Sequence, residues 1–88
     1  MEWTPAAKAK MEEMLEEVPS FLRKMVSRQG SLEAERLAQK KGLNVIDTRD
    51  MVVGYISATP RPMRENLKKA MIKFGFNPDD FREEFETL

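Results

Sequence analysis

Hydrophobic positions recur every three or four residues along most of the chain, a spacing typical of amphipathic helices. The first such segment follows Thr4-Pro5, a pair that favours a helix start because the hydroxyl can cap and proline needs no hydrogen there. Its apolar stripe consists of Ala7, Met11, Met14, Leu15 and Val18. Pro19 ends this helix and is predicted to open a second one. The apolar face of that second helix is predicted to be Phe21, Leu22, Met25 and Val26, so the pattern predicts a short two-helix corner.

The phase of the hydrophobic pattern changes at Gly30-Ser31. On one uninterrupted helix, Leu32 would lie with the earlier apolar residues, whereas the apolar residues of 34–38 would face about 150° away, at about 100° per residue. One core cannot bury both faces. We therefore expect a break or kink near Gly30, with Ser31 capping a new helix that runs to Lys41.

A further helix is predicted after residue 46. Asp47 is the expected cap, Asp50 lies where a capping box places its acid, and Ile46 and Met51 can form a hydrophobic staple. Residues 51–56 are rich in β-branched side chains and would suit a strand by propensity. Their apolar positions fit one helical face better than strand alternation, so we expect a helix here.

The stretch Thr59-Pro60-Arg61-Pro62 predicts a stiff linker and a boundary between two units. A regular amphipathic pattern follows from Met63 to Phe74, and Asn77-Pro78 opens a last short helix. Gly42 and Gly75 are expected to end the helices that precede them.

The overall prediction is an all-α fold, a compact bundle of five to six short helices. Residues 1–59 are expected to form one helical unit, and residues 60–88 a two-helix extension that packs on it. Phe81, Phe85 and Leu88 are predicted to share one face of the last helix.

Composition narrows the function classes. The 88 residues include no cysteine and no histidine, so the chain offers neither thiolate metal ligands nor an imidazole base. Lys+Arg and Asp+Glu each number 15, and this zero net charge argues against nucleic acid as a partner. No apolar run approaches the roughly 20 residues of a membrane span and no signal-peptide core is visible, so we expect a cytoplasmic protein without a membrane span.

No catalytic site can be assembled from the sequence. The serines have no histidine to activate them, the paired carboxylates fall on faces predicted to be solvated, and the glycines are isolated rather than arranged in a phosphate-binding loop. We expect no catalysis from this chain alone, no metal site and no resident cofactor.

The candidate interaction residues are few. Arg23, Lys24 and Arg28 can meet an anionic partner or can form an ordinary polar helix face. Trp3 can staple the first helix to the bundle or serve as a docking anchor. The seven methionines are expected to be mainly core filler, although methionine surfaces can also bind helices or flat ligands. With Phe21, the predicted interaction residues are thus Trp3, Phe21, Arg23, Lys24 and Arg28.

Two short motifs, W-T-P at Trp3-Thr4-Pro5 and P-x-F-x-R at residues 19–23, flank an acidic helix and precede a basic one. With the later helix entrance at Ile46-Asp47, the region from Trp3 to Ile56 resembles the C-terminal domain of the B subunit of light-independent (dark-operative) protochlorophyllide reductase. That enzyme is the nitrogenase-like reductase of chlorophyll and bacteriochlorophyll synthesis. The positions of this chain that carry the resemblance are Trp3, Pro5, Pro19, Phe21 and Arg23.

The resemblance implies a helical module that lies by the protochlorophyllide site at a subunit contact, while the cluster and the reducing machinery belong to other parts of the complex. It also implies a longer and more uniformly basic second helix than the break expected at Gly30 would allow.

Three functional hypotheses follow. The first is a non-catalytic docking module that binds a protein partner, such as nitrogenase-like reductase subunits where these are present, or a flat tetrapyrrole-like ligand. The second is a subunit or fragment of a protochlorophyllide reductase complex, active only with its partners. The third is a small helical nucleic-acid-binding protein that uses Arg23, Lys24 and Arg28, against which the zero net charge weighs.

Overall fold

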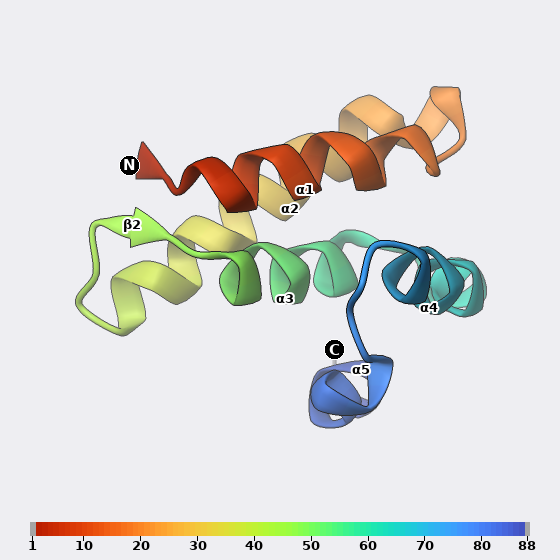
Figure 1. Ribbon diagram of the computed structural model, residues 1–88. Coiled ribbons are helices and arrows are strands. Elements are labelled where there is room, and N and C mark those ends of the chain that lie inside the picture. The colour runs from red at the N-terminus through yellow and green to blue at the C-terminus, as the bar shows by residue number, and fades with distance from the viewer. Residues whose placement is uncertain (1, 88) are drawn as a thin grey trace.

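The structure, a computed structural model, describes residues 2–87. Met1 and Leu88, the outer limits of the two predicted units, lie outside the described residues. The fold is all-α, as predicted, and the helices are α1 (Pro5–Glu16), α2 (Ser20–Lys40), α3 (Thr48–Ala58), α4 (Arg64–Lys73) and α5 (Arg82–Thr87). Shorter elements are β1 (Glu2–Trp3), β2 (Val45–Ile46) and the 3₁₀ helices η1 (Arg61–Met63) and η2 (Pro78–Phe81). In Figure 1, α1 lies above α3, α2 runs back behind α1 and then descends past the start of α3, α4 lies beyond the end of α3, and α5 lies below.

The helices begin and end at the cap residues and glycines predicted from the sequence. Thr4, Asp47 and Asn77 each accept a hydrogen bond from a backbone N–H in the following turn, at 3.1, 2.8 and 3.0 Å. Gly42 and Gly75 have φ angles of 73° and 90°, the left-handed conformation that closes a helix and that glycine adopts without strain. These three caps and two terminators are confirmed.

The capping box predicted at the start of α3 is closed on one side only. The Asp47 side chain caps the helix, but the Asp50 carboxylate is turned away from it and accepts a hydrogen bond from Lys41 Nζ at 2.6 Å. Asp50 is 1% exposed, and its second oxygen, Oδ2, has no hydrogen-bond partner. Ile46 and Met51 are both buried, as the staple requires. Asp50 therefore ties the end of α2 to the start of α3.

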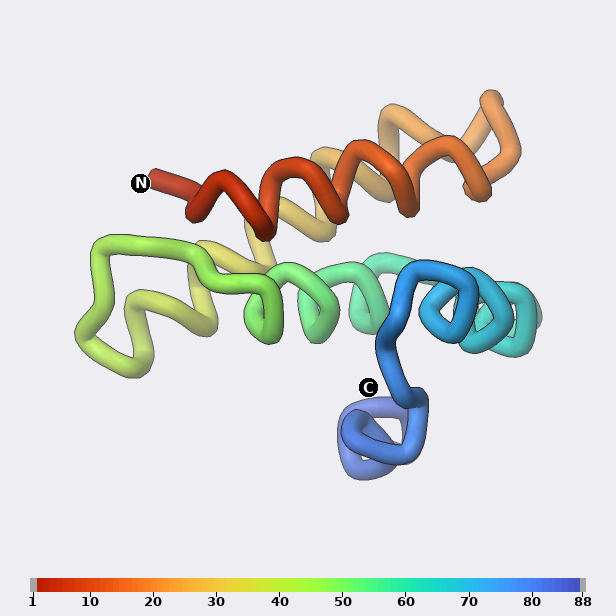
Figure 2. The backbone as a smooth tube through the Cα atoms, in the orientation of Figure 1, coloured from red at the N-terminus to blue at the C-terminus, as the bar shows by residue number. Residues whose placement is uncertain are grey.

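The predicted break at Gly30 is wrong, because α2 is one continuous helix of 21 residues. Figure 2 shows it as a single coil from orange to yellow-green. Gly30 is buried against α3, where a Cβ placed on Gly54 would lie only 2.4 Å from the Gly30 carbonyl oxygen and 3.0 Å from the Ala34 nitrogen. The backbones of α2 and α3 thus meet directly, and glycine serves close approach here rather than termination.

The apolar face predicted for the start of α2 is also largely wrong. Val26 is buried and Leu22 is partly buried, but Phe21 is 82% and Met25 40% exposed, and Leu32 further along is 53% exposed. The residues of α2 that are buried are mostly small: Val26, Gly30, Ala34 and Ala38. Larger side chains cannot fit between helices whose backbones lie this close, so they point to solvent.

Helix α3 and the short pairing of β1 with β2 complete the first predicted unit. Residues 51–56 lie within α3, which confirms the helical interpretation over the strand. A two-residue parallel pairing that was not predicted joins β1 to β2, with Trp3 opposite Ile46. The Trp3 side chain is partly buried against the core, so the start of the chain is held next to the entrance of α3.

One hydrophobic cluster contains buried residues from both predicted units. Met14, Val52 and Ile56 of the first unit belong to the same cluster as Leu67, Met71 and Phe81 of the second. An ion pair between Arg49 and Glu84, at 3.0 Å, also connects α3 to α5. Across residues 2–87, no helix combines the length and apolar character needed to cross a membrane.

Candidate interaction surfaces

The corner between α1 and α2 is held by Arg23. Its Nε donates a hydrogen bond to the Leu15 carbonyl at 2.8 Å, and one terminal nitrogen donates to the carbonyls of Glu16, at 3.3 Å, and Val18, at 3.1 Å. The Leu15 and Glu16 carbonyls lie in the last turn of α1, where no further turn of helix can supply donors, and the Val18 carbonyl lies in the connection to α2. The guanidinium fork therefore acts as a cap for α1, and its donors are directed inward at the corner.

Phe21, Met25 and Leu32 form an exposed apolar strip along α2, which we call the α2 strip. At about 100° per residue, these three residues and Arg28 fall within about 60° of one another on the helix surface. Lys24 and Arg28 are exposed beside them, and residues 18–32 contain no acidic side chain. The α2 strip is thus an apolar surface with a basic border, on the face of α2 that is turned away from α3.

Trp3 lies at a different place. Its side chain lines a shallow depression of about 380 Å³, together with Glu2, Lys8, Met11 and Ser31. Of the five residues predicted to interact, Phe21 therefore lies in the α2 strip and Lys24 and Arg28 border it. Arg23 belongs to the corner, and Trp3 belongs to the depression.

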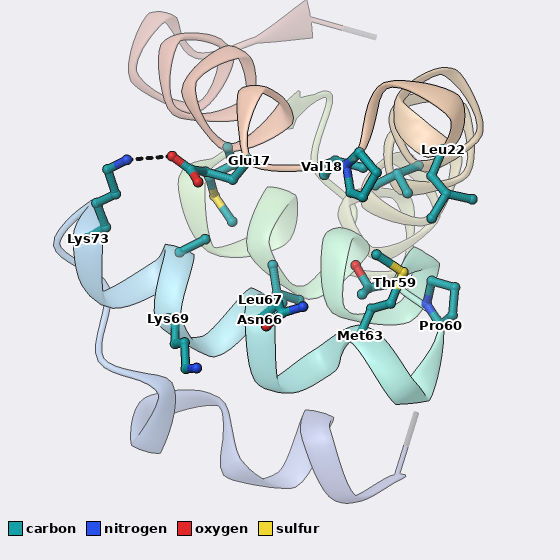
Figure 3. A pocket seen from close by; sticks show the side chains of 14 residues that line it. Glu17, Val18, Leu22, Thr59, Pro60, Met63, Asn66, Leu67, Lys69 and Lys73 are labelled. Carbon is teal, nitrogen blue, oxygen red and sulfur yellow. Dashed lines mark hydrogen bonds and ion pairs between the residues drawn. The ribbon is translucent and has the colours of Figure 1, made fainter.

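A cleft of about 340 Å³ separates the α1–α2 corner from the end of α3 and from α4. Sequence reasoning did not predict it. Its lining is mainly aliphatic and thioether, and the residues that shape it include Met14, Val18, Leu22, Met63, Leu67 and Ala70. Figure 3 shows side chains of the corner and of α4 facing each other across this space. The sequence predicts the apolar stripes of α1 and α4, but the space between them depends on how α4 packs against the α1–α2 corner.

The cleft has a charged end. Lys73 of α4 and Glu17, the C-cap residue of α1, form an ion pair at 2.5 Å that spans the space, as Figure 3 shows. The hydrogen bond to Glu17 and its negative charge raise the pKa of the Lys73 ammonium above its usual range. Lys69 also lines the cleft, and within residues 2–87 it has no ion-pair partner.

The described residues offer little reactive chemistry. Within residues 2–87, no three His, Cys, Asp or Glu side chains gather closely enough to hold a metal ion. The Tyr55 phenol is buried and donates a hydrogen bond to the Met11 carbonyl at 3.3 Å, and burial raises its pKa. What the surfaces present is apolar contact combined with fixed charge, which suits binding.

Fold and surfaces together define a small all-α protein with an exposed apolar strip, a shallow depression and a half-open apolar cleft. Residues 1–85 match the family described as "Protein of unknown function (DUF2621)", and the chain belongs to this family. Neither a curated protein nor a solved structure matches the chain.

Proposed function

We propose that this protein is a non-catalytic helical docking module that binds a partner protein through the α2 strip. The observation that carries the proposal is Phe21, a large aromatic side chain that is 82% exposed in the middle of a motif. Exposed aromatic residues are frequent anchors at protein interfaces, where burying them supplies much of the binding free energy.

Five residues of the two motifs carry the resemblance, and four of them have a role within the fold. Trp3 pairs with β2, Pro5 is the first residue of α1, Pro19 precedes the first turn of α2, and Arg23 caps α1. Phe21 differs, because its ring points to solvent. A partner that covers Phe21 accounts for an aromatic residue at this position.

The charges around the α2 strip favour a particular kind of partner. Lys24 and Arg28 border the strip without a neighbouring acid, so an apolar patch with a carboxylate border would be complementary. A second copy of α2 would instead bring these cations against one another. We therefore propose that the partner is a different protein, whose apolar patch has an acidic border.

The resemblance to the B-subunit domain of light-independent protochlorophyllide reductase supports this class of function. The continuous α2 supports it further, since a long second helix is what the resemblance implies. In a genome that encodes nitrogenase-like reductase subunits, we propose these as the partner, with the chemistry performed by them and not by this chain.

A photo-crosslinking experiment in the native host tests the docking surface. A benzoylphenylalanine is introduced at Phe21, Met25 or Leu32, and for comparison at Ile72, which is 64% exposed on α4. We expect the three positions of the α2 strip to yield the same adduct and position 72 to yield none. Adducts of equal yield from position 72, or none from the strip, would refute the proposal.

The identified partner then allows an affinity measurement with purified proteins. Phe21→Ala is expected to weaken binding at least tenfold, or about 1.4 kcal/mol, as for a central aromatic anchor. The double change Lys24→Glu and Arg28→Glu should slow association and remove its salt dependence. Ile72→Ala is the matched control and should bind like the original protein.

The Trp3 depression supports a second candidate, a flat tetrapyrrole-like ligand. Its half-buried indole offers a surface for stacking, and Lys8 on the same rim can pair with a ligand carboxylate. Titration with protochlorophyllide or a porphyrin should quench the single tryptophan, and Lys8→Gln should weaken the effect. Unchanged Trp3 fluorescence at saturating ligand would remove this candidate.

A further inference from the structure

We infer that the cleft between the α1–α2 corner and α4 binds a single-chain amphiphile with an anionic headgroup, which replaces Glu17 as the partner of Lys73. This inference does not depend on the α2 strip, because the cleft is lined by Leu22 and Val26 on another side of α2.

The shape and lining of the cleft favour a slender apolar ligand. Its volume of about 340 Å³ lies at the lower end of the range for small-molecule sites, roughly 300–1,000 Å³. Its walls carry Met14, Leu22, Met63 and Leu67 and no aromatic ring for stacking, so a flexible alkyl chain suits it better than a planar ring system. Methionine side chains adapt readily to such chains.

The charges of the lining favour an anion. Two lysines, Lys69 and Lys73, and one carboxylate, Glu17, line the cleft, which leaves one positive charge in excess. Among residues 2–87 the Lys69 ammonium has no ion-pair partner, and the Lys73 ammonium pairs with the exposed Glu17 and lies 5.7 Å from the centre of the Phe74 ring. An alkyl carboxylate can thus lay its chain on the apolar walls and its headgroup near Lys73.

Glu17 is a replaceable partner. It is the C-cap residue of α1, where the negative end of the helix dipole disfavours a carboxylate, and Glu16 adds a second negative charge beside it. Lys73, in contrast, lies in the last turn of α4, where a cation is favoured. Glu17 can turn outward into solvent while Lys73 stays in place to receive the incoming headgroup.

The opposite charges of this ion pair provide a sharp test. Glu17→Gln and Lys73→Gln break the same contact, but they should change ligand affinity in opposite directions. The probe is dodecanoate, titrated calorimetrically below its micellar concentration, with dodecanol as the neutral analogue. Lys68→Gln serves as the control, since Lys68 pairs with Glu65 and lies over the Phe85 ring instead of lining the cleft.

We expect Lys73→Gln to weaken dodecanoate binding about three- to fivefold and Glu17→Gln to tighten it by a similar factor, the range of an exposed ion pair. Lys68→Gln should leave the affinity for dodecanoate unchanged. Dodecanol should bind to the original protein and to all three variants with the same affinity. Equal effects of both ion-pair variants, tighter binding by Lys73→Gln, or no saturable binding of dodecanoate to the original protein would each overturn the inference. A crosslinking result on the α2 strip has no bearing on these outcomes, so the two proposals fail separately.

Discussion

Because α2 and α3 meet at Gly30 and Gly54, replacing these two glycines by alanine should change the stability of the protein in opposite directions. At Gly54, an added Cβ meets the Gly30 carbonyl oxygen at 2.4 Å and the Ala34 nitrogen at 3.0 Å. At Gly30, an added Cβ finds its nearest atoms at 3.8 Å, an ordinary van der Waals distance. The same change from glycine to alanine therefore collides with backbone on one side of the crossing and fits on the other.

The magnitudes follow from two terms. Alanine is favoured over glycine within a helix by about 1 kcal/mol, and this gain applies to both positions. At Gly54 the helices must separate by about 1 Å to restore contact at 3.4 Å, and overpacking of this kind costs about 1–3 kcal/mol or more. Since backbone atoms cannot rotate away, we expect a net loss of about 2–3 kcal/mol for Gly54→Ala. For Gly30→Ala we expect a gain of about 0.5–1 kcal/mol.

Thermal unfolding followed by far-ultraviolet circular dichroism measures both variants. For a domain of this size, Gly54→Ala should lower Tm by roughly 10–20 °C and Gly30→Ala should raise it by roughly 3–6 °C. Urea unfolding supplies the corresponding free energies. The reasoning is refuted if Gly54→Ala is as stable as the original protein. It is also refuted if Gly30→Ala is clearly destabilised, because the space beside Gly30 would then not accept a Cβ.

Three further expectations concern single side chains. Arg23→Lys should cost about 1–2 kcal/mol in urea unfolding, because a lysine cannot reproduce the fork that serves three carbonyls, while Lys24→Ala should change little. Lys41→Ala should cost about 2 kcal/mol and Asp50→Asn only about 1 kcal/mol, since losing the lysine leaves the buried carboxylate alone; the reverse order would contradict this account. Burial raises the pKa of Tyr55, so above about pH 10 the unfolded chain loses this proton first and stability should fall by about 1.4 kcal/mol per pH unit. Tyr55→Phe should flatten that slope in urea unfolding at alkaline pH, and equal slopes would disprove the linkage.

Features determined by neighbouring residues could be predicted from the sequence. Thr4, Asp47 and Asn77 cap helices because each contacts the next turn of its own chain. Gly42 and Gly75 end helices because of their own φ angles. The α-helix over residues 51–56 follows from apolar spacing, which outweighs strand propensity.

Features that depend on residues far away in the sequence could not be predicted. The sequence pattern predicts a local break at Gly30, whereas the backbone there packs against Gly54, 24 positions later. A signal was present, because Val26, Gly30, Ala34 and Ala38 recur every fourth residue, a pattern typical of closely packed helices. The exposure of Phe21 follows from the same close packing.

The interaction surfaces show the same division. Lys24 and Arg28 lie on one exposed face of α2, as expected both for a contact with an anionic partner and for an ordinary polar helix face. The capping role of Arg23 and the cleft beside Lys73 depend on how the corner turns and where α4 settles, and neither leaves a periodic trace in the sequence.

At about 1.5 Å per residue, α2 is roughly 31 Å long, and the longest dimension of the protein is 32 Å. This helix therefore spans the whole length of the molecule. Near its start, Phe21 points to solvent and Leu22 lines the cleft. Where α2 crosses α3, the contact is made by main-chain atoms and by the small Ala34 side chain, so no long side chain is available there to absorb a tilt. A tilt of α2 at this crossing would therefore displace α3 as well.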